Sequence, residues 1–280
     1  MSLVVVLTGF SFLLGLVIGS FLNVVICRYN TGETLWGRSR CFTCGRELSF
    51  KELFPLLSFL IQKGKCRNCL SKISWQYPIV EFLTALLFAL SFLKISSGVD
   101  ISMVTRPSFW AALFSAWAFI AILIVIAVYD YRHKIIPDFL VVLAIFLGLL
   151  GAWLSLERSG FANQMIFALH GLLLAGPTLA LPLAGLWFIS YGRWLGLGDA
   201  KLAYALGVFL GLSRGIVAFL LSFWIGAIIG LILIILGRFQ YLWFRKFSLK
   251  SELPFAPFLI AGALLSWLLP ANWLSWLIFF

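Results

Sequence analysis

The apolar residues of this chain are gathered in long runs that carry few or no charges. The first run, Leu3 to Cys27, holds 25 residues without a charge, which exceeds the ~20 residues that a helix needs to cross the hydrocarbon core of a membrane. Seven further runs follow it, at Pro78–Phe92, Phe109–Tyr129, Phe139–Leu156, Ile166–Ser190, Leu202–Leu212, Gly215–Gly237 and Pro254–Phe280. The pattern predicts an all-α polytopic membrane protein with about eight transmembrane helices.

The overall composition supports this prediction. Of the 280 residues, 62% are apolar and 11% are charged, whereas a soluble domain has about 45–50% apolar and ~25% charged residues. So large an apolar excess cannot be buried in one core of this size. A soluble enzyme, a disordered chain and a disulfide scaffold are therefore excluded.

The basic residues are distributed unevenly along the chain. Lys and Arg number 21 against ten Asp and Glu, a net charge of +11. With eight crossings, 17 of these basic residues lie on one side of the membrane, nine of them within residues 28–77, and four lie on the other. The positive-inside rule makes the first side cytoplasmic and places both termini outside. We therefore interpret the charge as a signal of topology and expect no nucleic acid as a partner.

Residues 28–77 are the only polar stretch long enough to form a module outside the membrane. They contain two CxxC pairs, Cys41 with Cys44 and Cys66 with Cys69, at a spacing typical of four-thiolate zinc sites. Disulfides are disfavoured in the cytoplasm, and a closed four-thiolate site leaves no position for a substrate, so we expect structural Zn²⁺. A zinc-ribbon that binds nucleic acid is an alternative, although the positive-inside rule explains the local charge without a ligand. The predicted division is a first transmembrane helix at 1–27, a cytoplasmic zinc module at 28–77 and a membrane core at 78–280.

Four acidic residues lie within the apolar runs or at their ends, where a carboxylate is costly and by default marks function. They are Glu81, Asp130, Asp138 and Asp199. Asp130 follows a long apolar run, and Asp199 stands in Gly196-Leu-Gly-Asp-Ala-Lys201. Both fall on the predicted cytoplasmic side, which suggests an aspartic peptidase whose two carboxylates share one proton and activate water.

The positions of these acids suggest further roles. Asp130 ends one predicted helix and Asp199 begins another, so the helix dipoles predict that Asp130 holds the shared proton more often. Asp138 follows Pro137 and begins an apolar run, so capping of a helix explains it without a catalytic role. Glu81 lies in the first turn of its run, and a structural and a functional role are equally open.

Taken together, these segments resemble the type IV prepilin peptidases, which are membrane aspartic peptidases of the GxGD type, over nearly the whole chain. The resemblance rests on Gly19–Ile26, the two CxxC pairs, Tyr77–Glu81, Asp130 with Ile136-Pro137-Asp138, Gly196–Lys201 and Pro254–Leu259. The sequence departs from the usual pattern at Arg132, where many relatives carry an acid, and at Ala256, where glycine is common.

The resemblance implies an enzyme of the bacterial inner membrane that cuts leader peptides from prepilins and type II secretion pseudopilins on the cytoplasmic face. The catalytic residues of the family correspond to Asp130 and Asp199. Many members then methylate the new N-terminus with S-adenosylmethionine, an activity associated with the N-terminal region, for which Glu81 is a candidate. The formation of a homodimer stays open. The residues that would support the catalytic loop are Gly196, Gly198, Lys201, Pro137 and Asp138.

Three other functions remain to be distinguished. A presenilin-like GxGD peptidase with other membrane substrates would lack the cysteine module and the motif of the first run. A proton-coupled transporter would place its acids near mid-membrane between inverted repeats. A membrane-anchored zinc-ribbon scaffold would give no role to Asp130 or Asp199.

Overall fold

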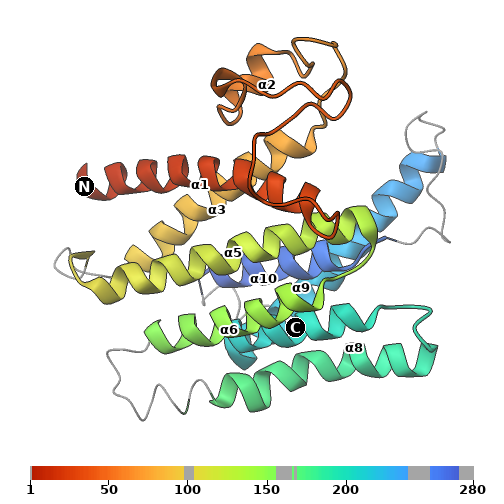
Figure 1. Cartoon of the computed structure of the whole chain (residues 1–280). Coiled ribbons are helices and arrows are strands. Elements are labelled where there is room, and N and C mark those ends of the chain that lie inside the picture. Colours follow the sequence, from red (N-terminus) through yellow and green to blue (C-terminus); the bar gives the residue numbers. More distant parts are fainter. Residues whose placement is uncertain (1, 98–103, 156–165, 167–168, 239–252, 271–280) are drawn as a thin grey trace. The chain divides into compact units, whose positions relative to one another are not determined.

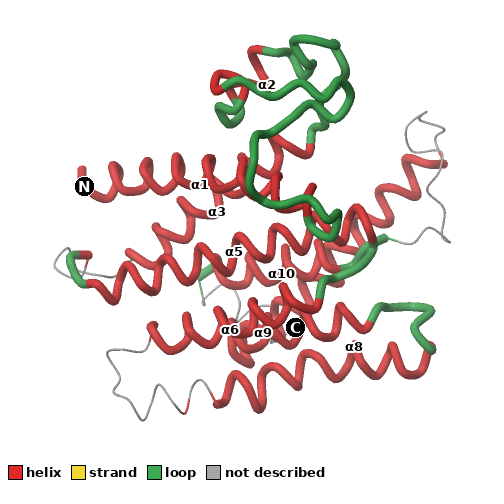
Figure 2. The backbone as a smooth tube through the Cα atoms, viewed as in Figure 1, coloured by secondary structure: helices red, strands yellow, loops and turns green. Residues whose placement is uncertain are grey.

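Every regular element in the described part of the chain is helical. The computed structural model describes residues 2–97, 104–155, 166, 169–238 and 253–270 (Figure 2). The elements are α1 (Ser2–Arg28), η1 (Phe50–Glu52), α2 (Leu57–Ile61), α3 (Gln76–Ser96), α5 (Pro107–His133), α6 (Asp138–Ser155), the π-helix η2 (Gly171–Ala175), α8 (Gly176–Ser190), α9 (Leu197–Arg238) and α10 (Ala256–Leu268). The predicted all-α class is confirmed.

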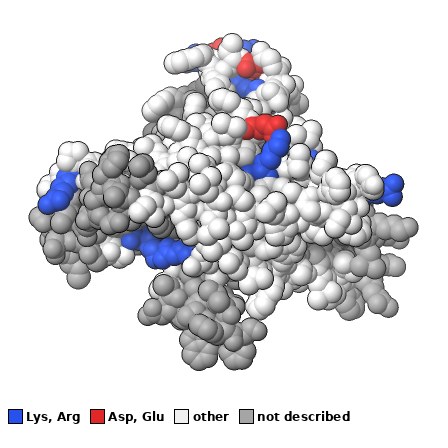
Figure 3. Space-filling view, turned by 90° about the horizontal axis from the view of Figure 1, so that it is seen from below, with Lys and Arg blue, Asp and Glu red and all other residues white. Residues whose placement is uncertain are grey.

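Within the described residues, five helices are long and apolar enough to cross a membrane. They are Leu3–Arg28, Gln76–Ser96, Pro107–His133, Gly171–Ser190 and Leu197–Leu236, and Asp138–Gly151 and Ala256–Leu268 are shorter apolar helices. In the view of Figure 3, the described charged side chains occupy a few separate patches on a mainly uncharged surface. Parts of three predicted runs, at residues 156, 167–168 and 271–280, lie outside the described residues.

The chain forms two compact units, residues 1–125 and residues 126–280. In the first unit, α1 and α3 pack against each other as antiparallel helices (Figure 1). A Cβ atom on Gly15 would lie 2.5 Å from the Cα of Ala85, and one on Gly19 would lie 2.8 Å from the Cα of Glu81. The two glycines form a GxxxG pattern, which allows helix backbones to approach closely. This contact determines where Glu81 lies.

In the second unit, α9 packs against α8 and α10. Gly176 of α8 lies against the ring of Tyr204, and Gly262 of α10 lies against the backbone of Ala218 and Ser222. Small residues again permit close packing, which replaces the hydrophobic driving force that is missing between helices in lipid. The packing holds the beginnings of α9 and α10 in one unit.

The long helix α9 changes direction at Gly211, where the backbone has φ +73° and ψ 177°. Gly207, before this residue, lies against Ala175, and Gly215, after it, lies against Leu179. A straight α9 antiparallel to α8 would carry Gly215 about 12 Å beyond Ala175 and away from Leu179. The chain therefore turns back at Gly211, and α9 consists of two helical segments, residues 197–210 and 212–238. Glycine suits this position because a side chain disfavours positive φ.

Candidate active site

Asp130 lies in the last turn of α5, with only 5% of its surface exposed. The backbone N–H of Ala256, the first residue of α10, donates a hydrogen bond to its carboxylate. Its second oxygen, Oδ2, is buried and has no hydrogen-bond partner among the residues that the structure describes. An oxygen in this state is available to a water molecule or a substrate, since buried carboxylate oxygens are normally paired.

Asp199 lies in the first turn of α9 and is 8% exposed. The backbone N–H of Gly196 donates to its Oδ2 at 3.2 Å, and the backbone N–H of Asp199 donates to the carbonyl oxygen of Gly196 at 3.2 Å. A Cβ atom on Gly198 would lie 3.0 Å from the Cβ of Ile136, a tighter contact than a side chain normally makes. The glycines of this loop therefore serve to hold the carboxylate in place and to admit Ile136.

Asp130 and Asp199 both lie in the second unit, and their carboxylates interact electrostatically. Asp130 stands at the carboxyl end of α5 but also accepts a hydrogen bond from the amino end of α10. The two helix ends act on its charge in opposite directions. The argument from the sequence alone did not include the second helix end, and the assignment of the shared proton to Asp130 stays a prediction.

An ion pair between Asp138 and Lys201 connects the segment that follows Asp130 with the loop and helix that carry Asp199. Lys201 Nζ donates to Asp138 Oδ1 at 2.7 Å, and both side chains are largely exposed. Asp138 is the first residue of α6, and Pro137 stands before it. The carboxylate thus pairs with a cation of α9, which the capping interpretation did not include.

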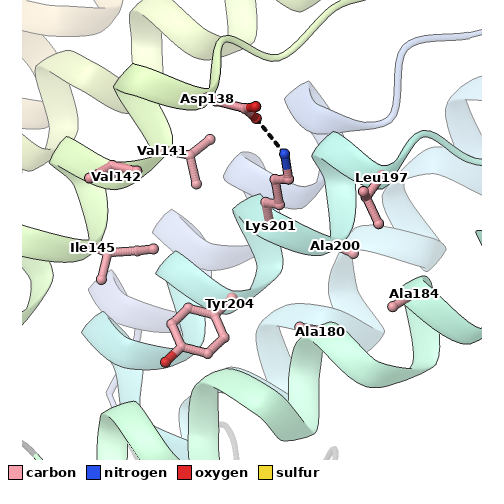
Figure 4. Close-up of a pocket in the computed structure, with 10 residues that line it drawn as sticks. All are labelled: Asp138, Val141, Val142, Ile145, Ala180, Ala184, Leu197, Ala200, Lys201 and Tyr204. Carbon is pink, nitrogen blue, oxygen red and sulfur yellow. Dashed lines mark hydrogen bonds and ion pairs between the residues drawn. The ribbon is translucent and has the colours of Figure 1, made fainter.

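A cavity of about 450 Å³ lies beside this ion pair (Figure 4). Apolar side chains of α6 and α8 line it together with Leu197, Ala200, Lys201 and Tyr204 of α9. These four positions share one face of α9, whereas Asp199 lies about 150° from the middle of that face around the helix. The cavity is therefore separate from the carboxylate pair.

The four cysteines of the loop module form two similar turns. The backbone N–H of Gly45 donates to the carbonyl of Cys41, and that of Leu70 donates to the carbonyl of Cys66. Gly45 and Leu70 both have positive φ, of 70° and 58°. Residues 39–48 and 64–73 share one pattern of backbone bonds at an offset of 25 residues. This internal repeat presents two pairs of sulfur atoms to one point.

The cysteine cluster fits a tetrahedral metal ion. The four sulfur atoms lie within 4.8 Å of one another, and the Sγ atoms of Cys41 and Cys69 are 3.8 Å apart. Zinc–sulfur bonds of about 2.3 Å in a tetrahedron place sulfur atoms ~3.8 Å apart. The backbone N–H groups of Cys44 and Thr43 lower the pKa of the Cys41 thiol to about 6, which favours the thiolate that metals bind. The predicted ligand set is thus brought together as a site that could hold a metal.

Glu81 is buried between α1, α3 and the loop module. Its Oε2 accepts a hydrogen bond from the backbone N–H of Leu56 at 2.8 Å, and Ser20 of α1 also hydrogen-bonds to it. Leu56 has φ +59° and ψ −49°, a conformation that is rare for a residue with a side chain. Glu81 thus links the loop module to the helix pair.

Two further contacts were not anticipated from the sequence. Ala256 acts through its backbone N–H, for which no side-chain signal exists. Glu52 accepts hydrogen bonds from the backbone of Ser49 at 2.8 Å and from Arg46 at 2.6 Å, with its side chain 1% exposed. The Ser-x-x-Glu pattern of Ser49 and Glu52, a capping-box signature, would have revealed this contact.

Two family models match most of the chain. Residues 13–95 match the "Bacterial Peptidase A24 N-terminal domain", and residues 117–231 match the "Type IV leader peptidase family". The first match includes the cysteine module and the second includes both aspartates. No solved structure matches the chain significantly.

Several curated proteins are similar over much of their length. A "Prepilin leader peptidase/N-methyltransferase" of Bacillus subtilis is 33% identical over 260 residues, which cover 92% of each chain. A "Type 4 prepilin-like proteins leader peptide-processing enzyme" of Escherichia coli is 35% identical over 215 residues, 69% of this chain and 73% of the relative. A "Prepilin leader peptidase/N-methyltransferase" of Myxococcus xanthus is 34% identical over 201 residues, 71% of this chain and 55% of the relative.

Proposed function

The chain belongs to the type IV leader peptidase family and is therefore a peptidase, and we propose that it cuts leader peptides from type IV prepilins and pseudopilins at the cytoplasmic face of a bacterial inner membrane. The names of its relatives support this substrate class. One structural observation carries the proposal. Two buried carboxylates, Asp130 and Asp199, lie in one unit, and a backbone N–H group holds each of them in place.

We assign an aspartic mechanism to this pair. Two interacting carboxylates hold one proton between them because like charges repel at short range. The ionised member takes a proton from water, and the resulting hydroxide attacks the carbonyl carbon of the scissile peptide bond. The protonated member donates its proton to the carbonyl oxygen. As the carbon–nitrogen bond then breaks, the proton taken from water passes to the leaving amine, and a hydroxyl of the tetrahedral intermediate returns a proton to the pair. The unpaired Oδ2 of Asp130 supports this assignment.

The assignment is tested with the purified full-length protein and a prepilin peptide in lipid nanodiscs. Asp130→Asn and Asp199→Asn should each lower cleavage by about 100-fold or more, since each removes an acid or a base from the reaction. Glu33→Gln is the matched control, because Glu33 is an exposed acid of the loop module, and it should cleave normally. If either asparagine variant cleaves at the wild-type rate, the mechanism is wrong.

We further propose eight membrane crossings, made by α1, α3, α5, α6, η2 with α8, the two segments of α9, and α10. The return of the chain at Gly211 supports the separate crossings of α9. A cysteine introduced at Arg193 or at Arg214 tests this topology with a thiol reagent that does not cross membranes, and each variant is compared with the unchanged chain because the native cysteines also react. The thiol of Arg193→Cys should react from the cytoplasmic side, and that of Arg214→Cys should react from the opposite side. If both variants react from the same side, the segment between them does not cross the membrane. An odd number of crossings would then place the two termini on opposite sides, contrary to the proposal.

Methylation of the product is the second part of the proposal. The names of relatives that include N-methyltransferase support it. S-adenosylmethionine would transfer its methyl group to the new N-terminal amine, which loses a proton. Glu81 stays the candidate residue, and Glu81→Gln should cleave normally but transfer less radiolabelled methyl than the wild type. Wild-type protein that cleaves without transferring label would remove the methyltransferase proposal and leave the peptidase proposal intact.

We propose that Cys41, Cys44, Cys66 and Cys69 hold a structural Zn²⁺. When bound, the ion would supply the folding energy that a small module lacks. The geometry of the four sulfur atoms supports this role. Replacement of Cys41 by Ser should remove zinc from the purified protein and make the loop module sensitive to protease, whereas Cys27→Ser should change neither.

The division of the chain into a first transmembrane helix, a zinc module and a membrane core at residues 27 and 77, and the formation of a homodimer, stay predictions.

A further inference from the structure

Part of the loop module exposes an unusual number of large apolar side chains. Within residues 50–61, called the apolar segment below, five such side chains are between 47% and 76% exposed: Phe50, Phe54, Leu57, Leu60 and Ile61. Contiguous exposed apolar residues of this kind mark a surface that another apolar phase covers. The segment includes α2, which lies in the loop between α1 and α3 (Figure 1).

The hydrogen bond between Leu56 and Glu81 places the apolar segment beside a membrane helix. Glu81 lies five residues inside α3, which begins at Gln76 and is long enough to cross a membrane. At 1.5 Å per residue, this is ~8 Å along the helix axis. The polar interface of a bilayer is about 5–8 Å thick on each side. With the start of α3 placed at the outer edge of that interface, Leu56 lies near the boundary between the interface and the hydrocarbon core.

The short helix α2 has one exposed and one buried face. Leu57, Leu60 and Ile61 are exposed at positions i, i+3 and i+4, which share one side of a helix. Phe59 is buried on the other side and packs against the ring of Trp75, with 4.9 Å between the ring centroids. The module thus uses Phe59 for its own core and leaves the opposite face of α2 without a protein partner in the described part of the chain.

Basic residues lie within the apolar segment and just after it. Lys51, Lys63 and Lys65 are exposed. The negative charge of Glu52, which also lies in this segment, is neutralised by its ion pair with Arg46. The local excess of charge is therefore positive, which is complementary to anionic head groups. A face of aromatic and aliphatic residues with lysines at its border is typical of segments that lie in the plane of a membrane interface.

We propose that the apolar segment is an interfacial anchor that lies between the head groups and the acyl chains of an anionic membrane surface, with Lys51, Lys63 and Lys65 at the head groups. Two observations favour a bilayer over a protein partner. The module is connected at both ends to membrane helices, α1 and α3, and Leu56 lies at the depth derived above. Only the identity of the leaflet, the cytoplasmic one, rests on the proposed function. The zinc module is thus partly embedded, whereas the sequence alone suggested a module outside the membrane.

The anchor is tested with full-length protein in nanodiscs of phosphatidylcholine and phosphatidylglycerol. Para-fluorophenylalanine replaces either Phe54 or, as a matched control, Phe42, which lies between the first two cysteines and is 79% exposed. Relaxation of the fluorine resonance is measured with a nitroxide near the top of the lipid acyl chain and, separately, with a water-soluble gadolinium chelate. The nitroxide should broaden the Phe54 resonance several-fold and the chelate should not, whereas Phe42 should respond mainly to the chelate.

Two results would overturn the anchor. Broadening of Phe54 by the chelate would place the segment in water. Shielding of Phe54 from both agents would mean that protein, such as a second copy or a substrate helix, covers it. Neither readout depends on cleavage, so a failure of the proposed function is recognised separately by the peptide assay.

The role of the lysines has its own comparison. With the nitroxide carried on phosphatidylglycerol, broadening at Phe54 should exceed that with the nitroxide on phosphatidylcholine. The combined change of Lys51, Lys63 and Lys65 to Gln should remove this difference. The control combines Arg67→Gln and Lys72→Gln, two exposed basic residues of the second cysteine turn, and should keep it. Equal loss in both variants would contradict the assignment of the three lysines.

Discussion

Ala256 donates its backbone N–H to the carboxylate of Asp130 and so joins the first residue of α10 to the last turn of α5. Ala256 is fully buried. The free N–H groups at the start of a helix carry partial positive charge, and here one of them orients a catalytic candidate. The position of Asp130 therefore depends on how α10 packs.

A larger side chain at Ala256 should impair cleavage. Ala256→Leu would place three extra carbon atoms in a filled space beside Asp130, and overpacking of this kind costs about 1–3 kcal/mol. We expect a loss of cleavage of roughly tenfold or more together with a lower temperature of unfolding. Ala256→Gly keeps the N–H donor and should cleave within about twofold of the wild type. Normal cleavage by the leucine variant would show that the contact with Asp130 is dispensable.

Gly198 should not tolerate a side chain. The Cβ of Gly198→Ala would lie 3.0 Å from the Cβ of Ile136, so Ile136 or the loop that carries Asp199 would have to give by a few tenths of an ångström. Since displacement of a catalytic group by about 1 Å costs up to ~100-fold in rate, we expect this smaller shift to lower cleavage by roughly two- to tenfold. The control is Gly185→Ala in α8, where a Cβ would meet nothing within 4 Å. Equal activity of the two variants would contradict the tight fit at Gly198.

The ion pair of Lys201 and Asp138 should contribute little by itself. Both side chains are largely exposed, and such pairs are worth ~0.2–1 kcal/mol. Lys201→Gln and Asp138→Asn should each lower kcat/KM by less than about fivefold, and the double variant should be no worse than the poorer single one. A double-mutant cycle measures this coupling. A loss above about 100-fold from Lys201→Gln alone would instead indicate that Lys201 contacts the substrate.

The loop module should lose stability on acidification through Glu52. The backbone N–H of Ser49 and the Arg46 guanidinium hold the pKa of this carboxyl below its ordinary value of 4.5. Such a group stabilises the fold above its ordinary pKa, and the contribution disappears as the pH falls through the lowered value. The wild type should therefore resist protease better than Glu52→Gln near pH 7, and this advantage should vanish in strong acid. Glu47→Gln, at an exposed ion pair, should follow the wild type throughout.

Several features of the site could be predicted because their geometry is local. Each CxxC pair lies within one short turn, so the spacing of the cysteines alone predicted the cluster that the structure brings within 4.8 Å. The loop around Asp199 is also local, because Gly196 bonds to a residue three positions away. The link between Ser49 and Glu52 had a sequence signature as well.

Other features join residues that are far apart in the chain. The bond from Leu56 to Glu81 spans 25 positions and the ion pair of Lys201 and Asp138 spans 63. No pattern along the chain encodes such pairs, since they depend on the path of each loop and on how closely the helices approach. The depth of the apolar segment became apparent only from the first of these contacts.

The sequence by itself determined the helical class, the apolar helices suited to a membrane, the cysteine cluster and the two candidate aspartates, because apolar run length, CxxC spacing and the rarity of acids are properties of neighbouring residues. Tertiary structure decided that Ala256 holds Asp130, that the chain reverses at Gly211, and that the Lys201 cavity lies away from Asp199. Each of these depends on helix packing, in which a single glycine or a backbone N–H without a distinctive side chain determines the contact.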